Sequence, residues 1–372
     1  MLSPRDRVRA VFAGERPDRP VVDLGGRVAS LSTPAYLALK AHLGYGDALD
    51  GETVTLLNTI GAFDERVLQR FDVPFRRVYL RPAASFTLAV AADGSFRDEW
   101  GVGYRPTGPY NERIGHPLAE ATLDDLEAFP WPDPHDPGRV AGLAEEARRL
   151  YETSDYALAA GHIGSGVFQD CWNLRGMARF MLDMAADRDF AEALLDRVLA
   201  VHVGMWEHFL DAVGDYVEMV ETADDLGGQD GLLISPQMYR DLVKPRHAAL
   251  NEALRARTNA RIFYHSCGAI MGLIDDLIEI GVQVLNPIQP LPGHMDPEAL
   301  RRRYGDRLVF HGGLDVQTVL PDGAPDDVRR HVRRYLDALG PERYIMAPAN
   351  SVQPGTPPEN IIAAFDEAAA TS

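Results

Sequence analysis

The chain has 372 residues, a formal net charge of −18 at pH 7 and two cysteines. This charge disfavours non-specific binding to nucleic acid, because phosphates attract basic surfaces. Two cysteines provide no disulfide framework, which suits a reducing compartment. Residues 1–14 have a charged helical pattern rather than the apolar core of a secretory signal, and no stretch has the length and apolarity of a membrane span. We therefore expect a cytoplasmic protein that binds neither nucleic acid nor membranes.

The N-terminal part, residues 1–137, mixes short helices with strands. A Ser-Pro pair at residues 3 and 4 is typical of a helix start. Residues 86–104 alternate in polarity around Ala92-Asp93-Gly94, which predicts an inserted β-hairpin. Residues 106–137 are rich in Pro and Gly and are expected to form an ordered surface connection. The other elements expected here are helices at 33–43 and 60–71 and strands at 21–24 and 75–80.

From residue 138 onward, strand and helix patterns alternate regularly. Short β-prone runs are expected as strands at 156–160, 216–220, 262–264, 282–285, 308–311 and 344–347. Helical patterns lie between them, at 138–152, in segments up to 184, and at 187–213, 236–257, 270–280, 297–304, 325–339 and from 358. Together with the two N-terminal strands, this makes eight parallel strands, the number that a TIM (β/α)8 barrel needs. We predict one α/β domain over residues 1–372, a TIM barrel with an N-terminal elaboration.

Polar residues gather at the predicted strand ends. In a barrel, the loops that follow the strands converge on one mouth. The side chains expected there are Asp23, Arg27, His162, Glu221, Asp224, Asp225, His265, Cys267, Asn286, Gln289, His311, Asp315, Asn350 and Gln353. A ring of this kind indicates a functional site, although each member alone is a weak signal.

His265 and Cys267, separated by one residue, offer an imidazole and a thiolate to one metal ion, and this pair best suits Zn²⁺. A zinc site needs three or four ligands, so a carboxylate from Asp224, Asp225 or Glu221 would have to complete it. The alternative is a buried Cys267, with His265 hydrogen-bonded to the next strand.

Four further positions each allow two interpretations. Arg27 follows two glycines and is suited to hold an anionic group, although a plain turn explains the glycines equally well. Gly313 either admits a substrate against backbone amides or forms a tight turn. His162 is more often a satisfied core histidine than a catalyst, and Asp315 either anchors a polar group or caps the next helix.

Several motifs together resemble the uroporphyrinogen decarboxylase superfamily. They are PDRPVVDLGG near the N-terminus, DDLGGQDGLLISPQMY at 224–239, HSCG, LNPIQP, FHGGLD and TPPENI, and they extend over nearly the whole chain. The resemblance implies a TIM barrel with its site at the C-terminal mouth. The superfamily includes decarboxylases that need no cofactor. It also includes zinc-dependent methyl- and alkyltransferases that pass a group between a corrinoid or epoxide and a thiol.

The sequence departs from both branches. The decarboxylases carry an arginine-rich loop near the N-terminus that holds many carboxylates, whereas this loop contains only Arg27. The zinc transferases add a second cysteine late in the chain, where Asn350 and its neighbours offer none. The third metal ligand would therefore come from Asp224, Asp225, Glu221 or His311.

We predict a methyl- or alkyltransferase with Zn²⁺ and a thiol or corrinoid substrate. His265, Cys267, Asp224 and Glu221 are the predicted metal ligands, and Asp225, Asp23 and His311 the predicted catalytic residues. The predicted substrate-binding residues are Arg27, His162, Asn286, Gln289, Gly313, Asp315, Asn350 and Gln353. A corrinoid protein is the expected methyl donor or acceptor, and a homodimer is left open. Two alternatives remain: a cofactor-independent decarboxylase in which Asp225 or Asp23 protonates the carbanion, and a non-catalytic barrel that binds a corrinoid or tetrapyrrole.

Overall fold

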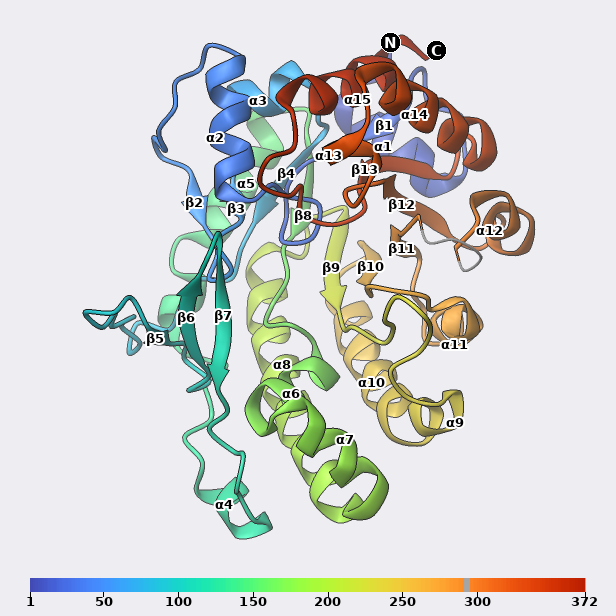
Figure 1. The fold of residues 1–372 in the computed structure, drawn as a ribbon. Coiled ribbons are helices and arrows are strands. Elements are labelled where there is room, and N and C mark those ends of the chain that lie inside the picture. Colours follow the sequence, from blue (N-terminus) through green and yellow to red (C-terminus); the bar gives the residue numbers. More distant parts are fainter. Residues whose placement is uncertain (291–294, 372) are drawn as a thin grey trace.

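A computed structural model describes residues 1–290 and 295–371. Eight parallel strands form one curled sheet in the order β1-β13-β12-β11-β10-β9-β8-β4, with helices around it (Figure 1). The strands are β1 (Val21–Val22), β4 (Phe75–Val78), β8 (Ala157–Ala160), β9 (Met219–Ala223), β10 (Arg261–His265), β11 (Val284–Ile288), β12 (Val309–Leu314) and β13 (Tyr344–Pro348). All eight overlap the predicted strands, although β9 and β11 begin and end later in the chain than predicted, and the prediction of a TIM-type α/β barrel is confirmed.

The strands form where short apolar runs are covered on both faces. β8, with the sequence ALAA, and β11, with the sequence VLNPI, are buried along their whole length. Burial of this kind is typical of parallel sheets whose faces are covered by helices and by the opposite wall of the barrel. Parallel pairing also brings the C-terminal ends of the strands to one edge, which is where the functional side chains meet.

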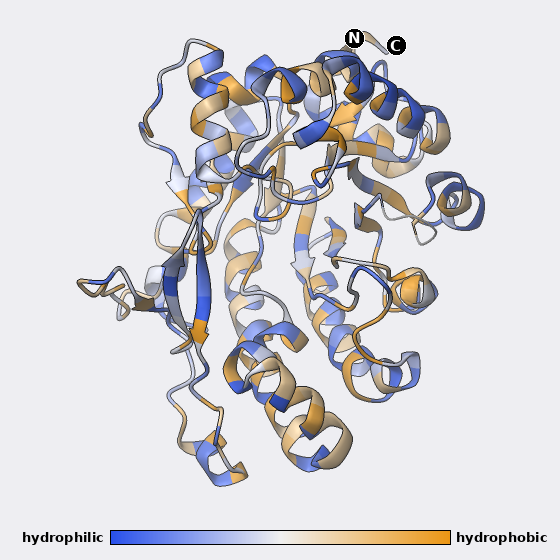
Figure 2. Ribbon diagram, in the orientation of Figure 1, coloured by the Kyte–Doolittle hydropathy of each residue, from blue (hydrophilic) through white to orange (hydrophobic). Residues whose placement is uncertain are grey.

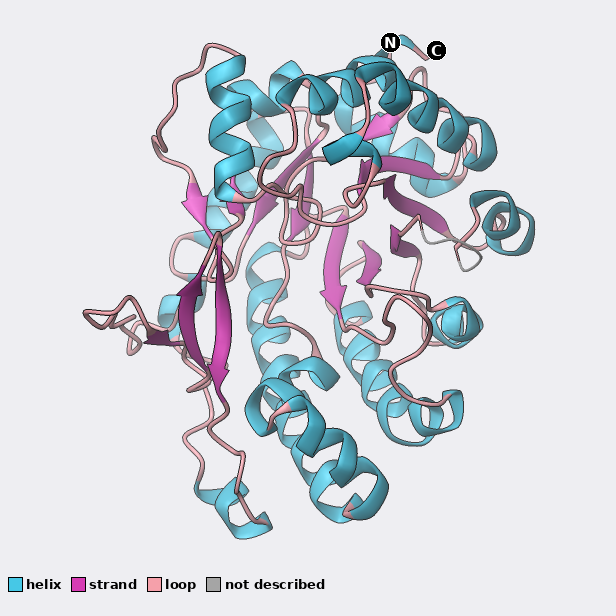
Figure 3. Cartoon of the chain, in the orientation of Figure 1, coloured by secondary structure: helices cyan, strands magenta, loops and turns pink. Residues whose placement is uncertain are grey.

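The helices surround the sheet (Figure 3). α14 shows why they form: it buries Val328, Val332, Tyr335, Leu336 and Leu339, which recur at helical spacing on one face. Figure 2 shows the hydrophilic residues of α14 and α12 on the outside of the barrel. The described helices are α1 (Pro4–Ala13), α2 (Thr33–His42), α3 (Glu65–Arg70), α4 (Leu123–Ala128), η1 (Pro137–Val140), α5 (Leu143–Thr153), α6 (Val167–Arg175), α7 (Met177–Ala186), α8 (Arg188–Val213), α9 (Pro236–Met238), η2 (Tyr239–Val243), α10 (Lys244–Arg255), η3 (Met271–Leu273), α11 (Ile274–Glu279), α12 (Pro297–Tyr304), α13 (Val319–Asp322), α14 (Pro325–Leu339) and α15 (Pro358–Ala370).

The N-terminal elaboration differs from its prediction in where the hairpin lies. Its main strands are β6 (Gly103–Thr107) and β7 (Tyr110–Gly115), joined at Gly108-Pro109, in a region expected to begin a surface connection. The turn at Ala92-Asp93-Gly94 carries only a single bridge, between Val90 and Phe96, and β5 (Phe96–Arg97) then pairs with β6. Proline falls at the end of β6, on the exposed part of this small sheet, where a missing N–H is tolerated.

Residues 60–71 also differ from the helix that was predicted. β3 (Ile60–Ala62) pairs with β2 (Thr53–Val54), and only then does α3 begin. Asp64 sets this start, because its side chain accepts a hydrogen bond from the backbone N–H of Arg66. In the described part of the chain, none of the helices combines the length and apolarity needed to cross a bilayer.

Candidate functional site

Three ligand-type side chains meet at the C-terminal edge of the barrel. His265 ends β10, Cys267 follows it by two residues, and Asp225 lies in the loop after β9. One ligand atom from each lies within 4.8 Å of the others. The Nε2 of His265 is 3.3 Å from the Sγ of Cys267 and 3.7 Å from the Oδ1 of Asp225. The backbone N–H of Cys267 donates to the same carboxylate at 2.8 Å, which orients it toward the pair.

These separations match what a tetrahedral zinc ion requires. Ligands at ~2.0–2.3 Å from the ion, spread at tetrahedral angles, stand roughly 3.3–3.8 Å from one another. Burial lowers the pKa of His265, so the ring is neutral near neutral pH and has a lone pair for a metal. Burial and the nearby Asp225 carboxylate raise the pKa of Cys267 well above its ordinary value. Without a neighbouring cation, Cys267 is therefore a protonated thiol.

A chain of hydrogen bonds leads from this group into the barrel. The Nδ1 of His265 lies 2.5 Å from the Oδ1 of Asn286, and the amide nitrogen of Asn286 lies 2.7 Å from the Nδ1 of His311. The Nε2 of His311 lies 3.0 Å from the Asp23 carboxylate. Asp23, which follows β1, Asn286 within β11 and His311 within β12 are thus joined to the candidate metal ligands rather than scattered around the mouth.

Arg77 on β4 ties this chain to the next strands. Its guanidinium contacts the Asp23 carboxylate at 2.5 Å and the Oε1 of Glu221 at 2.8 Å. β1 and β4 stand at the two ends of the strand order, so the Asp23–Arg77 pair links the edges of the sheet through side chains. Despite burial, Arg77 and His311 hold the pKa of Asp23 at about 2, so this carboxyl group is ionised at neutral pH.

Asp224, one of the predicted metal ligands, points away from the group. Its carboxylate accepts backbone N–H groups from Phe168 and Gln169, at the start of α6, both at 2.6 Å. It also lies 2.9 Å from the Nε2 of His247. Successive residues of an extended segment point in opposite directions, so Asp225 faces the mouth while Asp224 caps a helix. The prediction must be corrected: Asp225 stands in the ligand position assigned to Asp224.

Glu221, the other predicted carboxylate ligand, is also elsewhere. One of its oxygens binds Arg77, and the second lies 3.2 Å from the Nδ1 of His162 without hydrogen-bond geometry. Arg77 is the largest favourable influence on Glu221 and, against the effect of burial, keeps its pKa below the ordinary value. Glu221 and His162 therefore belong to the charged network below the mouth and not to the candidate metal ligands.

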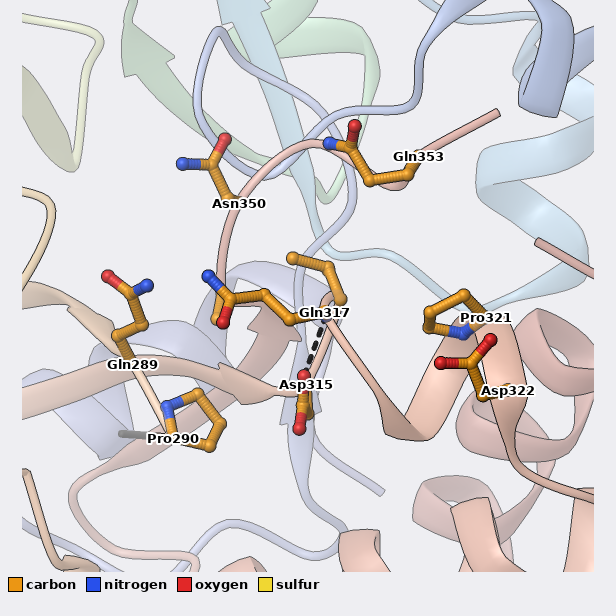
Figure 4. Close-up of a pocket in the computed structure, with 10 residues that line it drawn as sticks. Gln289, Pro290, Asp315, Gln317, Pro321, Asp322, Asn350 and Gln353 are labelled. Atoms are coloured by element: carbon orange, nitrogen blue, oxygen red, sulfur yellow. Dashed lines mark hydrogen bonds between the residues drawn. The ribbon is translucent and has the colours of Figure 1, made fainter. Parts of the chain in front are cut away.

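A cavity of about 520 Å³ lies among the loops at this edge of the barrel, and Figure 4 shows the residues that line it. Four predicted substrate-binding residues line it: Gln289, Asp315, Asn350 and Gln353. Asn350 reaches the metal group, because its amide nitrogen lies 3.3 Å from the Sγ of Cys267. Gln289 accepts the backbone N–H of Gly268, next to that cysteine, at 2.8 Å. Through Asn350 and Gln289 the cavity therefore lies next to the candidate metal ligands, although none of the three lines it.

Asp315 and Gly313 have structural roles in this region. Asp315 accepts hydrogen bonds from Gln317 and Thr318 and so caps the turn before α13, while it still lines the cavity. Gly313 has a φ of +86°, and a Cβ there would stand 2.6 Å from the Tyr335 ring. Gly313 thus lies within β12 and packs against α14, and its predicted contact with a substrate stays a prediction.

Residues 109–371 match the family model described as uroporphyrinogen decarboxylase (URO-D). The chain belongs to the uroporphyrinogen decarboxylase family. A uroporphyrinogen decarboxylase from Salinibacter ruber is 28% identical over 173 residues, which cover 46% of this chain and 45% of that protein. The chain thus matches less than half the length of this curated relative.

A solved structure extends the comparison over the complete fold. A methyltransferase from Methanosarcina mazei superposes with a TM-score of 0.66 at 17% identity, covering 100% of this chain and 99% of that one. At this identity the likeness shows the shared fold. The family match over residues 109–371 confirms the resemblance to the uroporphyrinogen decarboxylase superfamily.

Arg77 is the main site residue of this uroporphyrinogen decarboxylase family member that the motifs did not indicate. A signal was present, because arginine within a run predicted as a buried parallel strand demands a buried acidic partner. Arg27, by contrast, was predicted, but it lies apart from the metal group. Its guanidinium donates to the carbonyl oxygen of Gly164, in the loop after β8.

Proposed function

We propose that this protein is a zinc-dependent methyl- or alkyltransferase in which Asp225, His265 and Cys267 hold the metal. The observation that carries the proposal is the convergence of a carboxylate, an imidazole and a thiol within 4.8 Å at the barrel mouth. Zn²⁺ bound there would supply positive charge that lowers the pKa of a thiol substrate and makes it a nucleophile at neutral pH. Three protein ligands leave the fourth position open, as in catalytic zinc sites.

The surrounding residues have defined tasks in this proposal. Asn286 holds the Nδ1–H of His265, so that Nε2 keeps its lone pair for the metal. Asn350 donates to the sulfur of Cys267 and stabilises its thiolate form. The cavity beside them receives the thiol substrate, whose polar groups meet the amides of Gln289 and Gln353. A methylated corrinoid on a partner protein is the proposed donor.

A second candidate is a cofactor-independent decarboxylase, which the partial similarity to the Salinibacter ruber protein favours. Such an enzyme needs an acid that protonates the carbanion left by loss of carbon dioxide. Asp23 is unsuited to this task, because its pKa of about 2 keeps it ionised beside Arg77. Asp225, which is partly exposed at the mouth, is the remaining candidate from the sequence prediction.

Metal binding separates the two candidates. Protein purified without chelator should contain about one Zn²⁺ per chain. After exchange with Co²⁺, the spectrum should show tetrahedral d–d bands and a thiolate-to-metal charge-transfer band. Cys267→Ser should lose that band, whereas Cys171→Ala, which alters the other cysteine, should keep it.

Turnover then tests the reaction itself. Free methylcobalamin and 2-mercaptoethanol are the probes, and demethylation of the corrinoid is followed by absorbance. We expect a rate that depends on added Zn²⁺ and disappears in Cys267→Ser. Metal-free protein that demethylates methylcobalamin at the full rate, or protein that binds no Zn²⁺ or Co²⁺, would overturn the proposal.

A further inference from the structure

A second cavity, of about 320 Å³, lies between the barrel mouth and the N-terminal elaboration. We call it the hairpin pocket. The barrel contributes Arg27 and the loop after β8, from His162 to Ser165. The elaboration contributes an apolar wall that includes Leu56, Leu88, Trp100 and Tyr104. None of the predicted ligands of the metal group lines this pocket.

Most charged groups at the hairpin pocket already have partners. Arg139 binds Glu99 at 2.7 Å, Arg81 binds Glu146 at 3.0 Å, and Asp170 lies 2.9 Å from His202. Within each pair the two partners compensate each other, and the contacts hold the walls of the pocket together. They therefore leave little charge to offer to a ligand.

Two arginines are exceptions: Arg27, which lines the pocket, and Arg113, which lies beside it and reaches Ser165 of the lining. Across residues 1–290 and 295–371, neither guanidinium has a carboxylate within ion-pair distance. Both reach the same short loop: Arg27 donates to the carbonyl oxygen of Gly164, and the Nη2 of Arg113 lies 3.3 Å from the Oγ of Ser165. Burial lowers the pKa of Arg27 and the nearby charge of Arg113 lowers it further, while the Asp170 and Asp98 carboxylates, which also line the pocket, offset part of this effect. Two neighbouring cations in a partly buried pocket are stabilised by an anion.

The hairpin pocket also has unused polar capacity beside its apolar wall. His162 is buried; its Nδ1 lies 3.2 Å from the Glu221 carboxylate, and its Nε2 has no hydrogen-bond partner in the described part of the chain. The Nε of Arg113 is likewise buried and without a partner there. At the rim, Leu56 is 38% and Leu88 41% exposed, which leaves apolar surface to be covered. Buried polar atoms without partners and exposed leucines together favour an amphipathic ligand.

We propose that the hairpin pocket binds a small organic acid with one carboxylate and an apolar body. The carboxylate lies between Arg27 and Arg113, and the body packs against Trp100 and the exposed leucines. In the described part of the chain, a substrate with many carboxylates would find one unpaired arginine in the pocket lining, Arg27, and a second, Arg113, beside it. The volume of about 320 Å³ lies at the small end of ligand pockets. A role for this acid as the group donor or as an effector of the transfer rests on the proposed function. Its binding requires no metal.

Ligand binding to the zinc-loaded protein tests this. The probes are 3-phenylpropionate and 4-methylpentanoate, with 3-phenylpropionamide as the neutral isostere of the first, and binding is measured by isothermal titration calorimetry. We expect both acids to bind. The amide should bind at least about tenfold more weakly than its acid, because it cannot make charge-assisted hydrogen bonds to arginine. Phenyl phosphate serves as the dianionic comparison and should bind no better than the carboxylates.

Variants locate the binding. Arg27→Met and Arg113→Met should each weaken 3-phenylpropionate binding about tenfold, with the amide unaffected. Arg105→Met, which alters an exposed arginine of the same hairpin, is the matched control. Quenching of tryptophan fluorescence by the probe should disappear in Trp100→Phe. Circular dichroism and melting temperature establish that each variant is folded.

Three results would overturn the assignment: no binding of either acid at millimolar concentration, equal binding of acid and amide, or unchanged binding in both arginine variants. Failure of the proposed transferase function would look different. Cys267→Ser should lose zinc yet bind 3-phenylpropionate like the unaltered protein, because none of the predicted metal ligands lines the hairpin pocket.

Discussion

The Nδ1 of His265 and the Oδ1 of Asn286 are 2.5 Å apart. An amide oxygen only accepts hydrogen bonds, so Nδ1 must carry the proton of the neutral ring, and the Nε2 lone pair faces Cys267 and Asp225. The amide nitrogen of Asn286 donates to the Nδ1 of His311, whose Nε2–H therefore points at Asp23. One asparagine thus sets the tautomers of two histidines, and Asp23 anchors the arrangement.

Removal of this asparagine should weaken metal binding without removing a ligand. Asn286→Leu keeps the side-chain volume but leaves the Nδ1–H of His265 unpaired, so zinc affinity should fall by about tenfold to a hundredfold. The measurement is competition with a chromogenic chelator. Asn251→Leu is the control for destabilisation, because Asn251 is a buried asparagine that donates to the Ile280 carbonyl outside the site. Equal zinc affinities in the two variants would contradict the role of Asn286.

Substitution of Asp224 should lower the stability of the protein, whereas substitution of the neighbouring Asp225 should weaken metal binding. Asp224→Asn weakens the cap of α6 and the contact with His247, so it should lower the free energy of unfolding by about 1–2 kcal/mol and spare zinc binding. Asp225→Asn should do the reverse and lower zinc affinity with little effect on unfolding. Urea titration and zinc competition on both variants check this, and a loss of zinc in Asp224→Asn would contradict it.

The metal should be dispensable for folding. Cys267→Ser should abolish zinc binding but change the melting temperature by only about a few degrees, because a barrel of this size has a core independent of the metal. Calorimetry of the protein with and without chelator gives the same comparison without mutation. Cys171→Ala creates a small gap in the core, where Cys171 is 0% exposed, and should lower stability while zinc affinity is kept. Unfolding upon chelation would show that the metal is structural.

The buried pair of Asp23 and Arg77 should make stability fall in acid. The pKa of Asp23 drops from its ordinary value of 3.8 to about 2 on folding, so the stabilisation is complete above pH ~4 and is lost as the pH falls toward ~2. Asp23→Asn should therefore cost about 3 kcal/mol at pH 7, since it leaves Arg77 without this partner. The loss of unfolding free energy caused by Asp23→Asn should be smaller when the urea titration is carried out at pH 3. A cost that is the same at both pH values would contradict the ionised pair.

The sequence was sufficient to predict where the barrel strands lie and that His265 and Cys267 are close together. β-prone runs of three to six residues that alternate with helical patterns are local signals, and the polar residues at their ends had to share one edge of a parallel sheet. The hairpin at β6 and β7 was misplaced because two Gly-containing turns, at Gly94 and Gly108, compete over a short span with similar local chemistry. Local patterns alone do not decide such a competition.

Only the tertiary structure decided which carboxylate side chain contacts which partner. Asp224 and Asp225 are identical in type and adjacent in sequence, yet one caps α6 and the other faces Cys267, because the extended loop after β9 points them in opposite directions. The Arg77 network and the meeting of Arg27 with Arg113 at one loop depend on residues far apart in the chain. Such contacts are set by how the barrel closes and how the elaboration packs against it, and no local sequence signal contains that geometry.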